Sequence, residues 1–186
     1  MKTKLLKLLS ALTLILGTMS SASATKIDVM AGFYSFSANV LGKSTAVSGV
    51  GTYEISYLSP FKNHFEFVVG YSMTMTGVIG GDYSYGPKLG VNYFPWNFSS
   101  NEKISLPNKT IEVKDFYKPY FGFAFNQRQF QSAKSSFAGF GASAGMEKYI
   151  NSNYTIKTEL RMNTYTGPSA GTAKEMNVLV GIIFNF

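Results

Sequence analysis

The sequence predicts an all-β protein, an eight-stranded, antiparallel, up-and-down β-barrel that crosses a membrane. Eight segments alternate between two faces with the period of two that is typical of strands. Aromatic residues make up 16% of the chain and charged residues only 15%, whereas soluble domains carry about 25% charged residues. The last six residues, Gly181 to Phe186, continue this alternation to an aromatic terminus. Together these features are typical of a barrel in lipid.

Turn-like stretches separate the eight alternating segments, and each segment is long enough for a tilted membrane strand of about 9–11 residues. The segments cover residues 26–37, 47–58, 64–76, 83–94, 117–130, 135–150, 154–166 and 174–186. In the third segment Phe65, Phe67 and Val69 share one face, whereas Glu66 and Ser72 share the other. The first face suits hydrocarbon and the second suits a polar lumen.

Proline and glycine mark the positions where the strand pattern is under strain. Pro87 lies within the fourth segment, where its missing N–H removes a ladder bond, so we expect a bulge near Gly86 and Pro87. Gly49 and Gly51 fall on the outward face. Other glycines fall on the inward face and either make room for larger lumen side chains or leave water-filled space; these are Gly32, Gly70, Gly86, Gly90, Gly122, Gly139, Gly141, Gly145 and Gly181.

The first 24 residues predict a cleavable signal peptide. Three lysines, Lys2, Lys4 and Lys7, precede a short apolar core, and Ala22-Ser23-Ala24 has the small-x-small pattern of a cleavage site. The core is too short for a transmembrane anchor of about 20 residues, although an uncleaved anchor is the alternative. Removal of this leader lowers the formal charge from +7 to +4. We therefore expect no nucleic-acid partner, and with no cysteine in the chain disulfides do not stabilise it.

The leader, the eight segments and the ending Gly181-x-x-Phe184-x-Phe186 together resemble the small eight-stranded barrels of the bacterial outer membrane, of the OmpA transmembrane-domain and OmpX kind. The resemblance covers residues 25–186 and rests on pattern rather than on identity. It implies an outer-membrane location and contact with outer-membrane lipid. It also implies that Gly181, Phe184 and Phe186 form the signal that the barrel assembly machinery reads.

An even number of strands returns both ends of the barrel to one side of the membrane. The short connections at 59–63 and 151–153 then fit periplasmic turns, and the connections at 38–46, 77–82, 131–134 and 167–173 lie outside the cell. Residues 95–116 form a long periplasmic link that departs from the family pattern. We expect a flexible insertion, a small cap, or a short hairpin built from Ile104, Leu106, Ile111 and Val113.

Charged residues with inward parity predict a polar network in the lumen. Side chains about fill the interior of an eight-stranded barrel, and an unpaired buried charge is costly. The signs nearly balance, which favours ion pairs over a narrow conduit or gated pore. The predicted residues are Glu54, Glu66, Lys88, Arg128, Glu147, Lys157, Glu159, Arg161 and Glu175.

The sequence offers no constellation for catalysis, a cofactor or a metal. Barrel enzymes such as lipid A deacylases and omptin-type proteases need a histidine near the outer rim, but the single histidine, His64, follows a periplasmic turn. We expect His64 to be a polar interface residue. The glycine-rich stretch at 77–82 enters no helix, so we expect an outer loop and not a phosphate site.

The sequence thus predicts a non-enzymatic, monomeric outer-membrane scaffold that displays its outer loops for interaction. Three alternatives stay open: a narrow, porin-like channel for small solutes, a lipid-modifying enzyme, and a soluble secreted β-sandwich.

Overall fold

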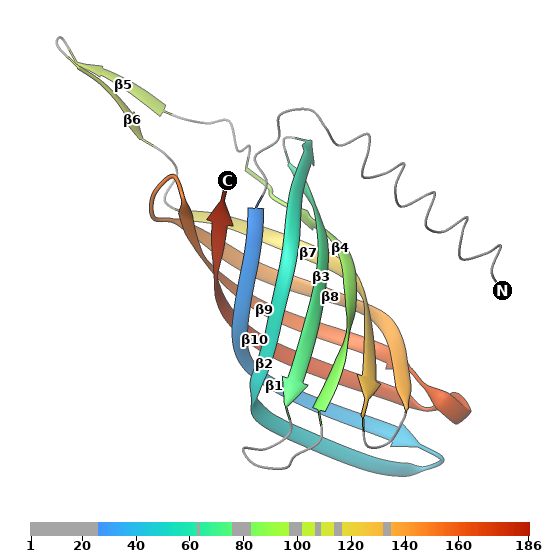
Figure 1. Cartoon of the computed structure of the whole chain (residues 1–186). Coiled ribbons are helices and arrows are strands. Elements are labelled where there is room, and N and C mark those ends of the chain that lie inside the picture. The colour runs from blue at the N-terminus through green and yellow to red at the C-terminus, as the bar shows by residue number, and fades with distance from the viewer. Residues whose placement is uncertain are drawn as a thin grey trace, which may run out of the picture.

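Eight strands close into a single antiparallel barrel in the computed structural model, which describes residues 26–62, 64–75, 83–96, 102–106, 109–113, 117–131 and 135–186. Around the barrel the strand order is β1-β10-β9-β8-β7-β4-β3-β2 (Figure 1). The barrel strands are β1 (Lys26–Val40), β2 (Lys43–Lys62), β3 (Phe65–Met75), β4 (Tyr83–Tyr93), β7 (Tyr117–Phe130), β8 (Ser136–Tyr149), β9 (Tyr154–Thr166) and β10 (Thr172–Asn185). The predicted fold class is confirmed, whereas the expected signal peptide and the loop at 77–82 lie outside the described residues.

The barrel is polar inside and apolar outside. Glu66 and Lys157 are fully buried, whereas Phe33 and Phe123 on the outer surface are about 60% exposed. Strand alternation produces both faces, because successive side chains point to opposite sides of a sheet. A β-sandwich is excluded, since the eight strands form one closed sheet and not two packed ones. Within the described part of the chain, no helix has the length and apolar character to cross a membrane.

The first and last strands close the barrel side by side, and Lys26 pairs with Asn185. We call the end where β1 begins and β10 ends the terminal end, and the opposite end the loop end. Beyond the terminal end lies a separate hairpin of β5 (Glu102–Leu106) and β6 (Lys109–Val113), in which Ile104 pairs with Ile111 (Figure 1). Of the forms expected for the 95–116 link, the structure therefore contains the hairpin.

The connection between β1 and β2 is shorter than the loop expected at 38–46. Both strands continue to a two-residue turn of Leu41 and Gly42, with φ angles of 52° and 76°. Positive φ at both positions is the geometry of the tight turn that matches the twist of a hairpin. The pairing of Val40 with Lys43 therefore extends this hairpin at the loop end. A short helical turn, η1 (Pro168–Ala170), connects β9 and β10 at the same end.

The prediction of a bulge at Gly86 and Pro87 is wrong. The β4–β7 ladder omits these two residues, yet its register is the same on either side, with Tyr85 opposite Gln129 and Lys88 opposite Asn126. On the other edge of β4, Pro87 stays in register with Tyr71 of β3. The missing N–H thus interrupts one ladder without adding a residue to either strand.

A bulge occurs instead at Gly51, which adopts a φ of 118° and has no partner in the β1–β2 ladder. Because of this extra residue, the side chains of β2 that precede Gly51 point to the side opposite to the one that simple alternation predicts. Gly49 consequently lies opposite Tyr34, whose side chain is buried in the lumen. The outward assignment of Gly49 is wrong for this reason. A Cβ atom at Gly51 would instead lie 3.6 Å from Met75 and 3.7 Å from the ring of Tyr53, which are both on the outer surface, so its expected outward side holds.

Candidate functional site in the lumen

Each charged residue predicted to face the lumen is buried inside the barrel, with a relative exposure of at most 5%. Seven of the eight barrel strands contribute to this set, because strand alternation places every second side chain in the interior. They are Glu54 on β2, Glu66 on β3, Lys88 on β4, Arg128 on β7, Glu147 on β8, Lys157, Glu159 and Arg161 on β9, and Glu175 on β10.

Two carboxylates and two cations form the central network. Glu54 accepts hydrogen bonds from Lys88 Nζ at 2.7 Å and from Arg161 Nη1 at 2.6 Å. Arg161 Nε donates to Glu159 Oε1 at 2.6 Å, and Lys88 Nζ lies 4.0 Å from the same carboxylate oxygen. Each buried charge therefore has at least one opposite charge in contact. Buried ions require this arrangement, since removal from water costs several kcal/mol for each of them.

Lys157 extends the network toward the terminal end. Its Nζ lies 2.7 Å from Asp28 Oδ2 and 3.9 Å from Glu159 Oε2. The hydroxyl of Tyr120 donates to Glu159 Oε2 at 2.7 Å, and the ammonium lies 5.0 Å from the centroid of the Tyr120 ring. Lys157 is thus held by two carboxylates and an aromatic face, an arrangement suited to a desolvated cation.

Arg128 and Glu175 form a separate ion pair nearer the loop end. Arg128 Nη2 lies 2.7 Å from Glu175 Oε1, and its Nε donates to the same carboxylate at 3.2 Å. Glu175 also accepts hydrogen bonds from Asn163 Nδ2 at 3.1 Å and from the Tyr165 hydroxyl, while Arg128 donates to Ser72. This side-on pair with further donors satisfies most of the capacity of both ions.

An apolar cluster, which we call the aromatic cap, fills the loop end of the lumen. It consists of Tyr34, Phe36, Phe130, Phe137 and Tyr165. The ring of Phe36 lies 5.0 Å from that of Phe130, 5.8 Å from that of Phe137 and 6.2 Å from that of Tyr165. The rings are tilted or edge-on, the geometries that aromatic pairs prefer.

Apolar side chains also occupy the terminal end. Leu58, Val68 and Ile183 are buried against one another, and the buried ring of Phe94 lies 5.5 Å from that of Tyr120. Apolar packing therefore bounds the charged part of the lumen at the loop end, whereas at the terminal end apolar side chains lie beside the Lys26–Glu66 ion pair.

Lumen glycines make room for large side chains. A Cβ atom at Gly145 would overlap the ring of Tyr120, and one at Gly141 would overlap the side-chain amide of Asn163. At these two positions the space is filled by a neighbour on an adjacent strand. The inward glycines were expected either to make room for larger side chains or to leave water-filled space. At these two positions they make room for larger side chains.

A few buried polar atoms have no hydrogen-bond partner among the described residues: Asp28 Oδ1, Glu147 Oε1 and both polar side-chain atoms of Asn177. Buried polar groups are ordinarily paired with protein or ordered water. Asn177 lies opposite Arg161 in the ladder, between the central network and the Arg128–Glu175 pair. These atoms mark where water molecules would complete the polar interior.

His64 lies at the terminal end, in the connection between β2 and β3. Its Nδ1 is 2.8 Å from the carbonyl oxygen of Phe94, and because a carbonyl only accepts, Nδ1 carries the proton. The backbone N–H of Phe94 donates in return to the His64 carbonyl at 2.7 Å. These two hydrogen bonds hold the β2–β3 connection against the residue that follows β4. In the described part of the chain, no three His, Asp or Glu side chains are grouped to hold a metal ion.

Several network members were missed at the level of sequence. Lys26 pairs with Glu66 at 2.9 Å, Asp28 pairs with Lys157, and Tyr120 and Tyr165 each donate to a carboxylate. A signal was present for the first two, since Lys26 and Asp28 share the inward parity of Gly32. The tyrosine hydroxyls had no such signal, because parity places a tyrosine in the lumen but does not identify its partner.

The residues of the expected assembly signal lie on β10 at the terminal end and just after it. The Phe184 ring meets that of Tyr154 edge-on at 5.6 Å, and Phe186 is 75% exposed. A Cβ atom at Gly181 would overlap Met30 in the lumen. This geometry accounts for the glycine by packing, and recognition of the three residues by an assembly machinery stays a prediction.

Comparison with solved structures finds proteins of similar fold. Neisserial surface protein A superposes with a TM-score of 0.58 at 14% identity, covering 89% of this chain and 98% of that one. The outer membrane protease OmpT from Escherichia coli gives 0.51 at 7% identity, covering 90% and 98%. The attachment invasion locus protein Ail of Yersinia pestis gives 0.49 at 11% identity, covering 89% and 100%.

The sequence itself matches no protein-family model and no curated protein. At these levels of identity the structural likeness concerns the fold alone. The resemblance to small eight-stranded outer-membrane barrels is therefore confirmed as one of architecture, and the chain has the fold of that group.

Proposed function

We propose that this protein is a non-enzymatic scaffold of a bacterial outer membrane, which holds its loop-end connections at the cell surface for interaction. The terminal end would face the periplasm, as the predicted leader and the pairing of first and last strands favour. The apolar outer surface supports a lipid environment, because an exposed belt of this size would be an aggregation hazard in water. The fold shared with known outer-membrane proteins supports the same location.

The observation that carries the scaffold role is the filling of the lumen. Ion pairs occupy it from the middle to the terminal end, and the aromatic cap packs across the loop end. The buried rings of the aromatic cap oppose a free path through the lumen at the loop end. The remaining surface for function is then the loop end, where β1 and β2 continue as a hairpin with Leu41 in its turn.

The non-enzymatic part of the proposal rests on the surroundings of the polar groups. His64 lies at the terminal end and bonds to a backbone carbonyl, away from the loop end where an external substrate would arrive. The buried carboxylates of the central network are engaged by cations. Fold likeness to a protease at 7% identity supplies no catalytic residue.

A narrow channel is the second candidate, and the unpartnered atoms of Asp28, Glu147 and Asn177 favour it. Water at these positions would connect parts of the polar interior. The aromatic cap opposes it, since any continuous path must pass Phe36 and its neighbours.

Two measurements on the purified protein test this proposal. The first is gel mobility in SDS before and after boiling, where a closed barrel is expected to shift. The second is conductance in a planar bilayer. A shift without current steps is the expected result, reproducible steps would favour the channel, and detergent-free solubility without a shift would overturn the membrane location.

A further inference from the structure

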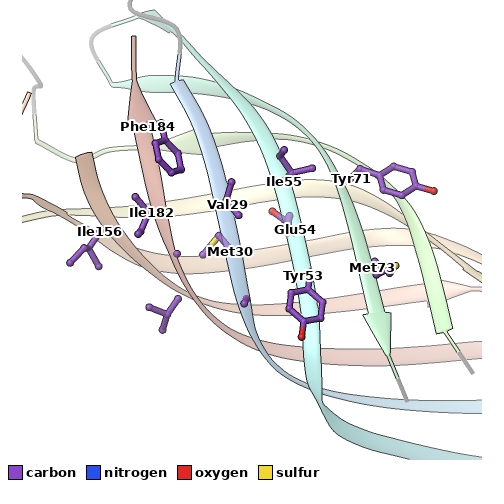
Figure 2. A pocket seen from close by; sticks show the side chains of 13 residues that line it. Val29, Met30, Tyr53, Glu54, Ile55, Tyr71, Met73, Ile156, Ile182 and Phe184 are labelled. Carbon is purple, nitrogen blue, oxygen red and sulfur yellow. The ribbon is translucent and has the colours of Figure 1, made fainter. Parts of the chain in front are cut away.

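The outer surface of the barrel has a hollow of about 790 Å³ across β9, β10, β1, β2 and β3 (Figure 2). Its floor is β1, where the outward side chains Val29 and Ala31 are small. Its walls are larger: Tyr53 lies opposite Ala31 on β2, and Ile182 lies opposite Val29 on β10. The hollow exists because small outward residues on one strand lie between bulky ones on its neighbours.

The surface of the hollow is almost wholly apolar. Apart from Glu54, whose carboxylate is engaged by Lys88 and Arg161 in the lumen, the side chains that line it are aliphatic, methionine or aromatic. Tyr53, Ile55 and Tyr71 are each about half exposed, so the hollow opens to the surroundings of the barrel. A second, smaller hollow of about 300 Å³ adjoins it through Ile55 and Tyr71 and continues to Ile27 and Tyr57.

The hollow lies in the half of the barrel next to the terminal end. Val29 and Ala31 are among the first residues of β1, which begins at Lys26. At about 3.3 Å per residue along a tilted strand, they lie less than about 17 Å from the start of β1. Since the hydrocarbon core is about 30 Å thick, this places the hollow in one leaflet, that of the terminal end.

We propose that this hollow binds one acyl chain of a phospholipid from the periplasmic leaflet. A void beside a rigid wall would forfeit the dispersion contacts that its lining can make, and a flexible acyl chain can follow its shape. Tyr57 at the periplasmic side of the smaller hollow suits the headgroup level, where aromatic residues with a polar tip are enriched. The inference rests on the membrane location proposed above and not on the scaffold role.

Native mass spectrometry of the detergent-purified protein, supplied with palmitoyl-oleoyl phosphatidylethanolamine, tests the proposal. We expect one retained lipid in the unmodified chain. Ala31→Leu raises the floor and should lower the lipid-bound fraction at least fivefold. Ala142→Leu is the matched control, since Ala142 is an outward alanine on β8, beside Phe123 and Met162 and remote from the hollow. The control should retain the lipid.

Each variant is first checked for the heat-dependent gel shift, and Val29→Phe provides a second way to fill the floor if Ala31→Leu does not fold. A gel shift with no retained lipid in the unmodified chain would overturn the lipid site while leaving the barrel intact. Equal loss in both alanine variants would do the same. Preferential retention of lipopolysaccharide over the phospholipid, abolished by Ala31→Leu, would overturn the assignment of the occupant.

Discussion

The central network and the aromatic cap fill the same lumen by opposite means. In the network, ion pairs between opposite charges join Glu54, Lys88, Glu159 and Arg161. The stability of each buried ion depends on the charge of its neighbours. In the cap, the rings of Phe36 and its neighbours make van der Waals contacts that depend on their size and shape. The comparison teaches that one interior can combine a part sensitive to charge with a part sensitive only to volume.

The strongest test of this difference removes the cation shared by two carboxylates. Arg161→Met keeps most of the volume but leaves Glu54 and Glu159 short of positive charge, and it should lower the free energy of unfolding by about 4 kcal/mol. Urea titration of the protein refolded into lipid vesicles measures the loss. Lys174→Met, at an exposed position on β10, is the control and should change it by less than about 0.5 kcal/mol.

Adding Glu54→Gln to Arg161→Met sharpens the comparison. The second change removes one of the orphaned charges, so the double variant should lose less than the sum of the single variants. Strict additivity would show that the contacts of the central network do not depend on charge.

In the cap, Phe36→Ala should cost about 3 kcal/mol, because it leaves a cavity among rings that cannot fully collapse. Phe36→Leu should cost about 1 kcal/mol, as a substitution that nearly conserves volume. Both are measured by the same urea titration. Equal costs for the two variants would contradict a cap that is sensitive to volume.

Tyr165 belongs to both regions, since its ring lies in the cap and its hydroxyl donates to Glu175. Tyr165→Phe keeps the ring and removes one hydrogen bond to a buried carboxylate, so we expect a loss of about 2 kcal/mol. Combined with Phe36→Ala it should show coupling in a double-mutant cycle, whereas Arg161→Met with Phe36→Ala should be additive. Coupling in the second pair instead would mean that the two regions are one unit.

The smallest effect is expected outside the lumen. Lys148 Nζ lies 5.4 Å from the centroid of the Tyr117 ring, on the surface near the terminal end. Lys148→Ala should cost about 0.5 kcal/mol, in line with an exposed cation–π contact. A loss comparable to that of Arg161→Met would show that burial does not govern the strength of these charges.

Strand alternation made the fold and much of the lumen predictable. The period of two assigned Glu66, Lys157 and Arg161 to the interior, and all three are buried there. Parity cannot anticipate an inserted residue, which is why Gly49 was assigned to the wrong face beyond the bulge at Gly51. Nor can it say which strands face one another across a lumen, so the pairing of Asp28 with Lys157, 129 residues apart, needed the structure.

The two errors at proline and glycine have a common cause. Pro87 changes hydrogen bonding without changing the residue count of its strand, whereas Gly51 adds a residue without a visible break in the sequence pattern. Local propensity marks both as irregular, but only the ladder distinguishes a missing bond from an extra residue.

The pairing of Lys26 with Asn185 has a consequence for the order in which this protein can fold. Barrel closure joins the first described strand to the last, so each shorter, growing chain has an unpaired edge. Such edges are templates for aggregation, and long-range pairings of this kind form slowly. The closed barrel therefore cannot form while the chain is being synthesised, and its first strand keeps an open edge until the final strand has arrived.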